Sequence, residues 1–109
     1  MSRAKGDVAE DRACAFLLEN GFLIIERNFY SRFGEIDIIA IKDKVIHFVE
    51  VKSGLDYESA IQNITKTKLS RLIKTGYVYL KKNALNVDYM YDALIVTPQK
   101  IWYLENITI

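Results

Sequence analysis

The stretch of sequence that decides the fold is residues 34–52, which read GEIDIIAIKDKVIHFVEVK. Two apolar runs, 36–41 and 45–51, have the composition of buried β-strands, and the charged segment 42–44 between them predicts a tight turn. Acidic residues nevertheless interrupt both runs. Because charged side chains are rarely left in buried strands without a partner, this predicted hairpin is the first place to look for chemistry.

The spacing of the charged residues predicts that they meet across the hairpin. Side chains on a strand alternate between its two faces, so Asp37 shares a face with Glu35, and Glu50 shares one with Lys52. A two-residue loop at 43–44 would place Asp37 opposite Glu50 and Lys52 opposite Glu35. Directly opposed Cβ atoms lie about 5 Å apart, whereas a slip by one residue would send Asp37 to the other face. We therefore expect the register of the hairpin to decide whether a site exists.

Two interpretations of this charge cluster are open. Facing carboxylates repel each other unless a positive charge lies between them, so Asp37 and Glu50 are suited to hold Mg²⁺ (or Mn²⁺) together with water and phosphate oxygens. Lys52 would then stabilise the charge that develops on a phosphate in the transition state, or position the attacking water. The alternative is a simple cross-strand salt bridge between Glu35 and Lys52, without a metal.

Length and composition predict one small intracellular domain. The chain of 109 residues suffices for a single domain, expected to span 1–109, and its 50% hydrophobic content argues against disorder. One cysteine, Cys14, offers neither a disulfide nor a zinc site, which is typical of a reducing compartment. No secretory signal and no membrane-spanning run is visible. We expect a cytoplasmic protein without a membrane partner.

The overall charge weighs against strong nonspecific binding of nucleic acid, because 15 basic and 14 acidic residues leave a net charge of only +1. The basic residues are unevenly distributed, however. Lys68 lies within an apolar helical stripe, where a lysine either snorkels outward or reaches a polar site. The candidate nucleic-acid contacts all lie in a helix predicted for residues 57–82: Lys66, Lys68, Arg71 and Lys74.

Helical periodicity predicts two helices around the hairpin. The first, 2–20, begins with a serine as its N-cap and stops at Gly21. It carries Glu10 beside its apolar stripe, where an acid could border the hairpin site. The second spans 57–82 after an aspartate cap, and Gly76 within it indicates close packing or a bend.

The remaining segments predict the rest of a sheet. Residues 22–25, 89–96 and 101–104 have the pattern of strands, and 28–33 reads as a loop or an irregular strand. The order is then helix, three strands, long helix and two strands, which predicts an α/β fold with a mixed sheet and a helix on each side. The only histidine, His47, lies on the strand face away from the acids. We expect it to be packed and exclude it as a general base.

Taken together, these motifs resemble the YraN-like family of small bacterial proteins. That family is similar to the restriction-endonuclease-like superfamily, and in particular to the archaeal Holliday-junction resolvases. The resemblance implies a single-domain restriction-endonuclease-like fold, with a mixed central β-sheet flanked by helices. It covers nearly the whole chain in the correct order and rests on residues 6–10, the Asn-Gly pair at 20–21, Asn28, and residues 34–37, 48–52, 68–72, 79–80 and 91–92.

The resemblance also implies roles for individual residues. The acidic metal ligand of the superfamily's nuclease motif corresponds to Asp37. Its second acid and its lysine correspond to Glu50 and Lys52, and its N-terminal helical glutamate corresponds to Glu10. Glu35 and Lys68 also match family positions, with no role that the resemblance specifies.

Three functional hypotheses follow. The first is a Mg²⁺- or Mn²⁺-dependent endonuclease that hydrolyses phosphodiester bonds in nucleic acid, with DNA favoured over RNA and branched or structured forms as candidate substrates. Asp37, Glu50 and Glu10 would bind the metal and Lys52 would complete the catalytic set, which needs no histidine or cysteine. A homodimer would suit symmetric cleavage of a junction.

The second hypothesis is a nucleic-acid-binding or assembly module that retains the nuclease fold without turnover. It predicts DNA binding that depends on salt concentration and does not need the metal-binding acids. The basic helix would then matter more than Asp37. For either hypothesis, Ser-Gly-Leu at 53–55 departs from the family pattern, because the basic residue that members often carry after the motif lysine, and with it a phosphate contact, is missing. A purely structural, salt-bridged hairpin is a third hypothesis and predicts no dependence on metal at all.

Overall fold

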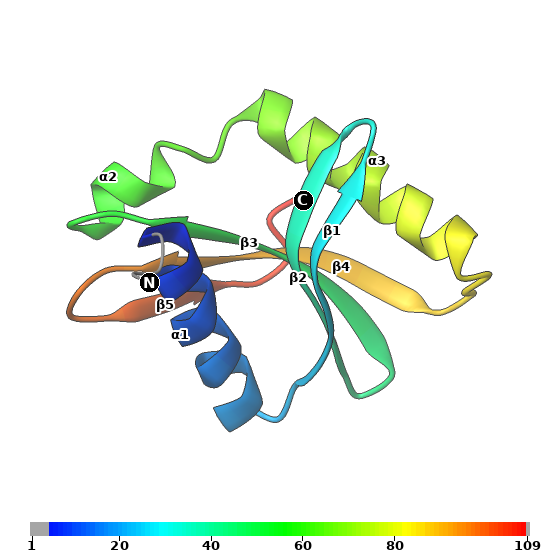
Figure 1. The fold of residues 1–109 in the computed structure, drawn as a ribbon, viewed down its shortest axis with the longest axis horizontal. Helices are drawn as coiled ribbons and strands as arrows, with labels where there is room; N and C mark the ends of the chain where they lie inside the picture. Colours follow the sequence, from blue (N-terminus) through cyan, green and yellow to red (C-terminus); the bar gives the residue numbers. More distant parts are fainter. Residues whose placement is uncertain (1–4, 109) are drawn as a thin grey trace.

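The fold is a five-stranded mixed sheet with helices on both faces (Figure 1). The computed structural model describes residues 5–108, and the side chains from Asp7 to Thr108. Strand order follows the sequence, β1-β2-β3-β4-β5, and only the β3–β4 pair is parallel. The predicted α/β fold with a mixed sheet is confirmed. Its elements are α1 (Lys5–Glu19), β1 (Leu23–Ser31), β2 (Gly34–Lys42), β3 (Val45–Ser53), α2 (Tyr57–Ile61), α3 (Lys66–Lys82), β4 (Asp88–Val96) and β5 (Ile101–Leu104).

Each face of the sheet carries its own hydrophobic core. Ile38 and Val49 pack in a cluster with α1, whereas their neighbours Ile39 and Phe48 pack in a second cluster with α3. Alternate residues of a strand point to opposite faces, so α1 and α3 cover opposite sides of the sheet, as Figure 1 shows. This explains why β2 and β3 are apolar on both faces. No helix within residues 5–108 is long and apolar enough to cross a membrane.

The turn between β2 and β3 sets the register of the hairpin as predicted. Lys42 pairs with Val45, and the two loop residues Asp43 and Lys44 both adopt positive φ angles, 51° and 67°. Positive φ at both central positions is the geometry of a type I′ turn, whose twist matches that of the flanking strands. The loop thereby aligns the whole ladder from Val45 toward Glu50.

Helix α1 ends at the predicted glycine. Gly21 has φ +88°, its N–H donates to Leu18 O at 3.2 Å, and Phe22 N–H donates to Leu17 O at 3.0 Å. These two bonds form a Schellman motif, which satisfies the last carbonyls of the helix. The predicted N-cap, Ser2, lies outside the described residues.

The first strand is longer than the short strand predicted for 22–25. Of the two alternatives for 28–33, a loop or an irregular strand, the second is correct as far as Ser31, since β1 spans Leu23–Ser31. Its pairing with β2 shifts by one residue between Ile24 and Glu26, and Asn28 adopts φ 55°. A bulge of this kind breaks the alternation of apolar residues that would identify a strand from sequence.

The second predicted helix, 57–82, is in fact two helices. Asp56 caps the short α2 by accepting from Ser59 N–H at 2.8 Å, and Thr65 caps α3 by accepting from Lys68 N–H at 3.2 Å. A capping hydroxyl competes with continued helix, since it satisfies an N–H group that the preceding turn would otherwise use. The chain therefore changes direction at residues 62–65 and α3 starts afresh.

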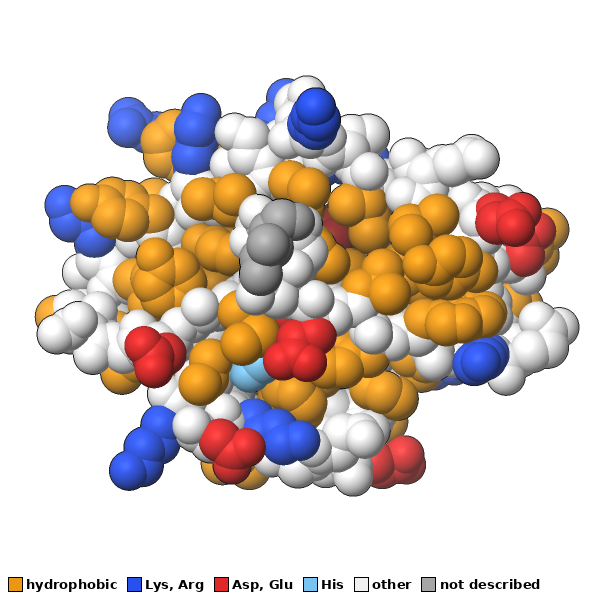
Figure 2. Space-filling model, turned by 180° about the vertical axis from the view of Figure 1, so that it is seen from behind, with side chains coloured by type: hydrophobic (Ala, Val, Ile, Leu, Met, Phe, Trp, Pro, Cys, Tyr) orange, Lys and Arg blue, Asp and Glu red, His pale blue; other side chains and the backbone are white. Residues whose placement is uncertain are grey.

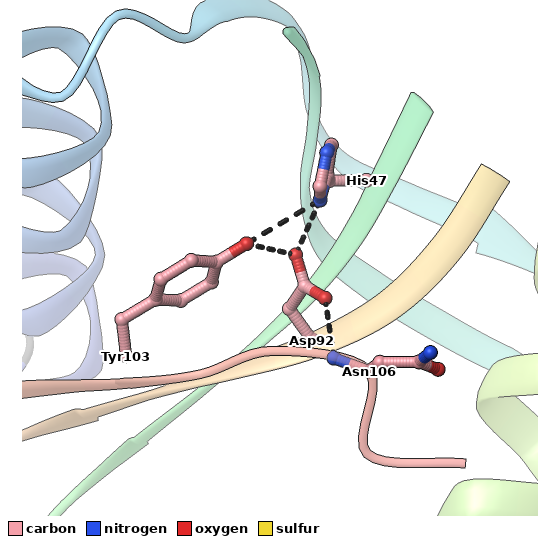
Figure 3. Close-up of polar contacts among 4 residues, drawn as sticks. All are labelled: His47, Asp92, Tyr103 and Asn106. Carbon is pink, nitrogen blue, oxygen red and sulfur yellow. Dashed lines mark hydrogen bonds and ion pairs between the residues drawn. The ribbon is translucent and has the colours of Figure 1, made fainter. Parts of the chain in front are cut away.

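A buried carboxylate ties the end of the chain to the sheet (Figure 3). Asp92 is fully buried in β4, and its Oδ2 lies 2.5 Å from His47 Nδ1 and accepts from Tyr103 Oη at 2.5 Å. Its Oδ1 accepts from Asn106 N–H at 2.9 Å. Burial, followed by the hydrogen bond to Asp92, raises the pKa of Tyr103. His47 is thus packed, as expected, with its ring 5.0 Å from that of Phe22.

Close packing explains the glycine in α3. A Cβ built on Gly76 would lie 2.4 Å from Tyr91 Oη, which donates to Ile73 O at 3.1 Å. Helix and sheet approach so closely here that only a hydrogen fits between them. The sequence prediction of close packing at this position is confirmed.

Gly76→Ala should therefore lower the free energy of unfolding by about 1–3 kcal/mol, because strain against the Tyr91 ring outweighs the gain in helix propensity. Urea unfolding followed by circular dichroism would measure it. Ser70→Ala, at an exposed position of the same helix, serves as the control and should change stability by less than about 0.5 kcal/mol. A more stable Gly76→Ala protein would contradict the packing described here.

Candidate functional site

The sheet forks at one end, where β2 and β3 part. Their pairing runs from the turn only as far as Ile38 and Val49. Beyond that point β2 stays paired with β1 as far as Gly34, and β3 stays paired with β4 as far as Ser53. Asp37 and Glu50 occupy the next opposed positions, immediately after the last pair, so both carboxylates lie in the mouth of the fork.

A cavity of about 400 Å³ fills the fork and brings the predicted residues together. It lies between the N-terminal half of α1 and the first turns of α3, because the separation of the strands lets both helices reach it from opposite faces. Seven of the residues predicted from sequence line it: Glu10, Glu35, Asp37, Glu50, Lys52, Lys68 and Arg71. The other two basic candidates lie elsewhere. Lys66 borders a separate hollow beside Ile107, and Lys74 lies over the ring of Phe33.

Asp37 is the most perturbed acid of the cavity. Its Oδ2 accepts from Val51 N–H at 2.7 Å. Burial, and then the negative charge of Glu50, raise the pKa of Asp37 to about 7, against the smaller opposing effect of that hydrogen bond. The charges of Glu10 and Glu35 act in the same direction as that of Glu50. A carboxyl group in this position is near half-protonated at neutral pH unless a cation joins it.

Glu10 reaches the cavity from α1, and its surroundings leave one oxygen poorly satisfied. Its side chain is only 12% exposed, and Oε1 lies 3.5 Å from Arg27 Nη2 without accepting a hydrogen bond from the described residues. Burial raises the pKa of Glu10, and the charge of Arg27 partly opposes this. Arg27 also contacts Asp11 at 2.9 Å. Arg27 was not predicted as a site residue, since nothing in the sequence shows that α1 crosses β1 at this residue.

Lys52 pairs with Glu50 and not with the residue predicted. Its Nζ lies 2.7 Å from Glu50 Oε1, with both side chains about one-fifth exposed or less. The predicted placement opposite Glu35 is wrong, because β2 and β3 have separated before they reach that level. Glu35 instead pairs with Tyr30 of β1. The alternative interpretation, a salt bridge between Glu35 and Lys52, is therefore also wrong.

The donor set fits a hard divalent cation. Asp37, Glu50 and Glu10 supply carboxylate oxygens, which are the ligands that Mg²⁺ and Mn²⁺ prefer. Glu10 Oε1 accepts no hydrogen bond from the described residues although Arg27 lies nearby, and the raised pKa of Asp37 indicates an acid whose charge is poorly compensated. Within the described residues, no group of three potential ligands is yet close enough to hold an ion. A metal would have to draw Glu50 from Lys52 and Glu10 from Arg27.

Two cations of α3 stand at the rim of the cavity. Lys68 and Arg71 line it, both are exposed, and neither forms an ion pair within the part of the chain that the structure describes. They lie about one helical turn apart and so face the same way. Such a pair is suited to bind the oxygens of a phosphate that enters the cavity.

Comparison with known sequences gives a consistent family match. The model of the uncharacterised protein family UPF0102 matches residues 9–96. A UPF0102 protein of Sulfurimonas denitrificans is 78% identical over 109 residues, covering all of both chains. A UPF0102 protein of Aliarcobacter butzleri is 52% identical over 99% of each chain, and one of Helicobacter pylori strain HPAG1 is 54% identical over 97% of this chain and 92% of its own.

The raised pKa of Asp37 predicts how stability depends on pH. Between the ordinary value of 3.8 and about 7, the folded state binds more protons at this carboxyl than the unfolded chain does. The contribution of Asp37 to the free energy of unfolding should therefore fall as pH rises through that range and level off above it.

Asp37→Asn removes this contribution and retains the acceptor for Val51 N–H. At pH 8 in EDTA the variant should be more stable than the wild type by about 1–3 kcal/mol, and the difference should vanish near pH 4. Thermal unfolding over a pH series would measure it. Asp43→Asn, in the exposed turn, is the control and should show no such trend. A less stable Asp37→Asn protein at pH 8 would contradict the assignment.

Proposed function

We propose that this chain, which belongs to the uncharacterised protein family UPF0102, is a divalent-metal-dependent nuclease whose active site is the cavity at the fork of the sheet. The observation that carries the proposal is the convergence in one cavity of Asp37, Glu50 and Glu10 with three cations, Lys52 of β3 and the α3 residues Lys68 and Arg71. Metal-dependent phosphodiester hydrolysis uses acids that hold the metal and a lysine beside them. It also uses cations that bind the phosphate at the edge of the site.

The three carboxylates would hold the metal. Asp37 is kept in place by the Val51 N–H, which leaves its Oδ1 without a hydrogen bond from the described residues. Glu10 offers the unsatisfied Oε1. When bound, a divalent ion polarises the phosphate and lowers the pKa of an attacking water. Its positive charge would also relieve the repulsion that keeps Asp37 partly protonated.

Lys52 and the α3 cations would act on the phosphate. The ion pair with Glu50 holds Lys52 Nζ inside the cavity, where a positive charge stabilises the extra negative charge of the transition state. Lys68 and Arg71 would bind the phosphate oxygens and orient the backbone. His47 and Cys14 are buried in the α1 face of the sheet and take no part.

The proposed fold family and substrate follow from the resemblance that the sequence motifs indicate. A mixed sheet that forks between two strands, with an acid on one strand and Glu-x-Lys on the next, supports a restriction-endonuclease-like fold. The resemblance to Holliday-junction resolvases favours DNA, in branched or otherwise structured forms, as the substrate. The proposed activity is therefore that of a Mg²⁺- or Mn²⁺-dependent endonuclease.

One observation favours the second hypothesis, a nucleic-acid-binding module without turnover. Lys52 and Arg27 already contact Glu50 and Glu10, so part of the acidic charge is balanced by the protein itself. A module of this kind would bind nucleic acid in EDTA and would not need Asp37. Binding would depend on salt concentration, through cations such as Lys68.

The proposal predicts metal-dependent cleavage that requires the acids and the lysine. Wild-type protein with Mg²⁺ or Mn²⁺ should cleave at least one of a panel of labelled single-stranded, duplex, flap and four-way DNA substrates. Asp37→Asn, Glu50→Gln and Lys52→Met should each lower the rate by about two orders of magnitude or more, because each removes charge at the reacting phosphate. Gel analysis of single-turnover reactions would measure the rates.

The control variants also neutralise one acid and one lysine, in the turn between β2 and β3. Asp43→Asn and Lys44→Gln are exposed at the far end from the fork, and both variants should retain the wild-type rate. Full activity in Glu50→Gln would exclude the proposed metal ligands. Binding of the panel without any cleavage by folded wild-type protein would instead support the binding module.

A further inference from the structure

We infer that the tip of the β1–β2 hairpin seats a single-stranded segment of nucleic acid beside the cavity. The inference rests on the proposed nuclease function and narrows its substrate class. We call Tyr30 to Gly34, together with Lys74 of α3, the hairpin seat. It adjoins the cavity directly, because Gly34 and the neighbouring Glu35 belong to the cavity wall.

Tyr30 offers an unoccupied aromatic surface at the edge of the acidic site. It is 70% exposed although it lies in a paired strand, directly opposite Glu35. A hydrogen bond to Glu35, followed by the charge of that residue, raises the pKa of Tyr30. The exposure of Tyr30 leaves the face of its ring available to stack with a base.

Two cations share one aromatic ring at the turn. Arg32 Cζ lies 4.8 Å and Lys74 Nζ 5.7 Å from the centre of the Phe33 ring. Neither cation has an acidic partner among the described residues. Arg71, which lines the cavity, lies beside this turn, since a Cβ on Gly34 would be 3.6 Å from Arg71 Cβ. The positive charge of the seat thus continues into the cavity.

The hairpin seat is anchored to α3 and does not depend on a flexible loop. Ser31 Oγ lies 2.9 Å from Thr75 Oγ1 and accepts from Phe33 N–H at 3.0 Å. Thr75 Oγ1 also donates to Arg71 O at 2.9 Å. In Figure 1 the β1–β2 turn lies next to α3, and Lys and Arg side chains gather along the same upper edge in Figure 2.

Single-stranded nucleic acid fits this surface better than a continuous duplex. Unpaired bases expose their faces and can stack on an aromatic ring, while cations follow the backbone. The bases of a duplex are already stacked on each other. A net charge of +1 gives the protein little general attraction for nucleic acid. Binding of a single strand would therefore depend on the local cations Arg32 and Lys74 and on the exposed ring of Tyr30.

The charge of the seat is tested by paired substitutions. Arg32→Gln with Lys74→Gln should weaken binding of a labelled single-stranded oligonucleotide in EDTA at least about tenfold, and should reduce the salt slope by about 1.4. Fluorescence anisotropy at several salt concentrations would measure both. The control is Lys81→Gln with Lys100→Gln, which removes the same charge from two lysines that also lie over aromatic rings, those of Tyr77 and Trp102. Equal losses in the two proteins would overturn the seat.

Stacking on Tyr30 is tested separately. Tyr30→Leu should weaken the same binding at least about fivefold, whereas Tyr77→Leu, at a 58% exposed tyrosine of α3, should not. On an oligonucleotide that lacks its bases, wild type and Tyr30→Leu should bind equally. Tighter binding of duplex than of single strand, unchanged in Tyr30→Leu, would overturn the assignment of substrate class.

The two proposals fail in different ways. Binding is measured in EDTA, so it needs neither metal nor turnover. Binding that depends on Tyr30 with no cleavage by wild type would refute the nuclease and support the seat. Cleavage that depends on Asp37, together with binding that is indifferent to Tyr30, Arg32 and Lys74, would support the nuclease and refute the seat.

Discussion

The separation of β2 from β3 is the constraint on which the rest of the site depends. An uninterrupted sheet would bury Asp37 and Glu50 between neighbouring strands, and the helices on its two faces could not meet. Because the pairing ends at Ile38 and Val49, the edge of each strand opens into a cavity that α1 and α3 both reach. Side chains of α1 and α3, which cover opposite faces of the sheet, therefore line the same cavity.

Two aspartates of the sheet differ in how far the protein compensates their charge. Asp92 has His47 and Tyr103 at one oxygen and a backbone N–H at the other, so its burial is fully compensated. Asp37 accepts only one hydrogen bond from the described residues, and desolvation, followed by the charges of the neighbouring acids, raises its pKa to about 7. Strongly perturbed carboxyl groups cluster at functional sites, and the divalent cation that we propose would account for the condition of Asp37.

Local sequence signals identified most elements but misjudged where two of them end. The turn at Asp43, the stop at Gly21 and the strands of the C-terminal hairpin each depend on residues close in sequence, and these predictions were correct. The cap at Thr65 and the bulge near Glu26 were not predicted, because a single hydroxyl and one extra residue leave the hydrophobic pattern almost unchanged.

The sequence by itself determined the fold class, the register of the central hairpin and the acids that stand in it, since alternation and turn chemistry are local properties. Only the tertiary structure decided which charges meet. Lys52 contacts Glu50 because the strands diverge before Glu35, and Glu10 meets Arg27 because α1 crosses β1. Contacts between distant segments depend on how helices pack across a twisted sheet, and no spacing along the chain encodes that angle.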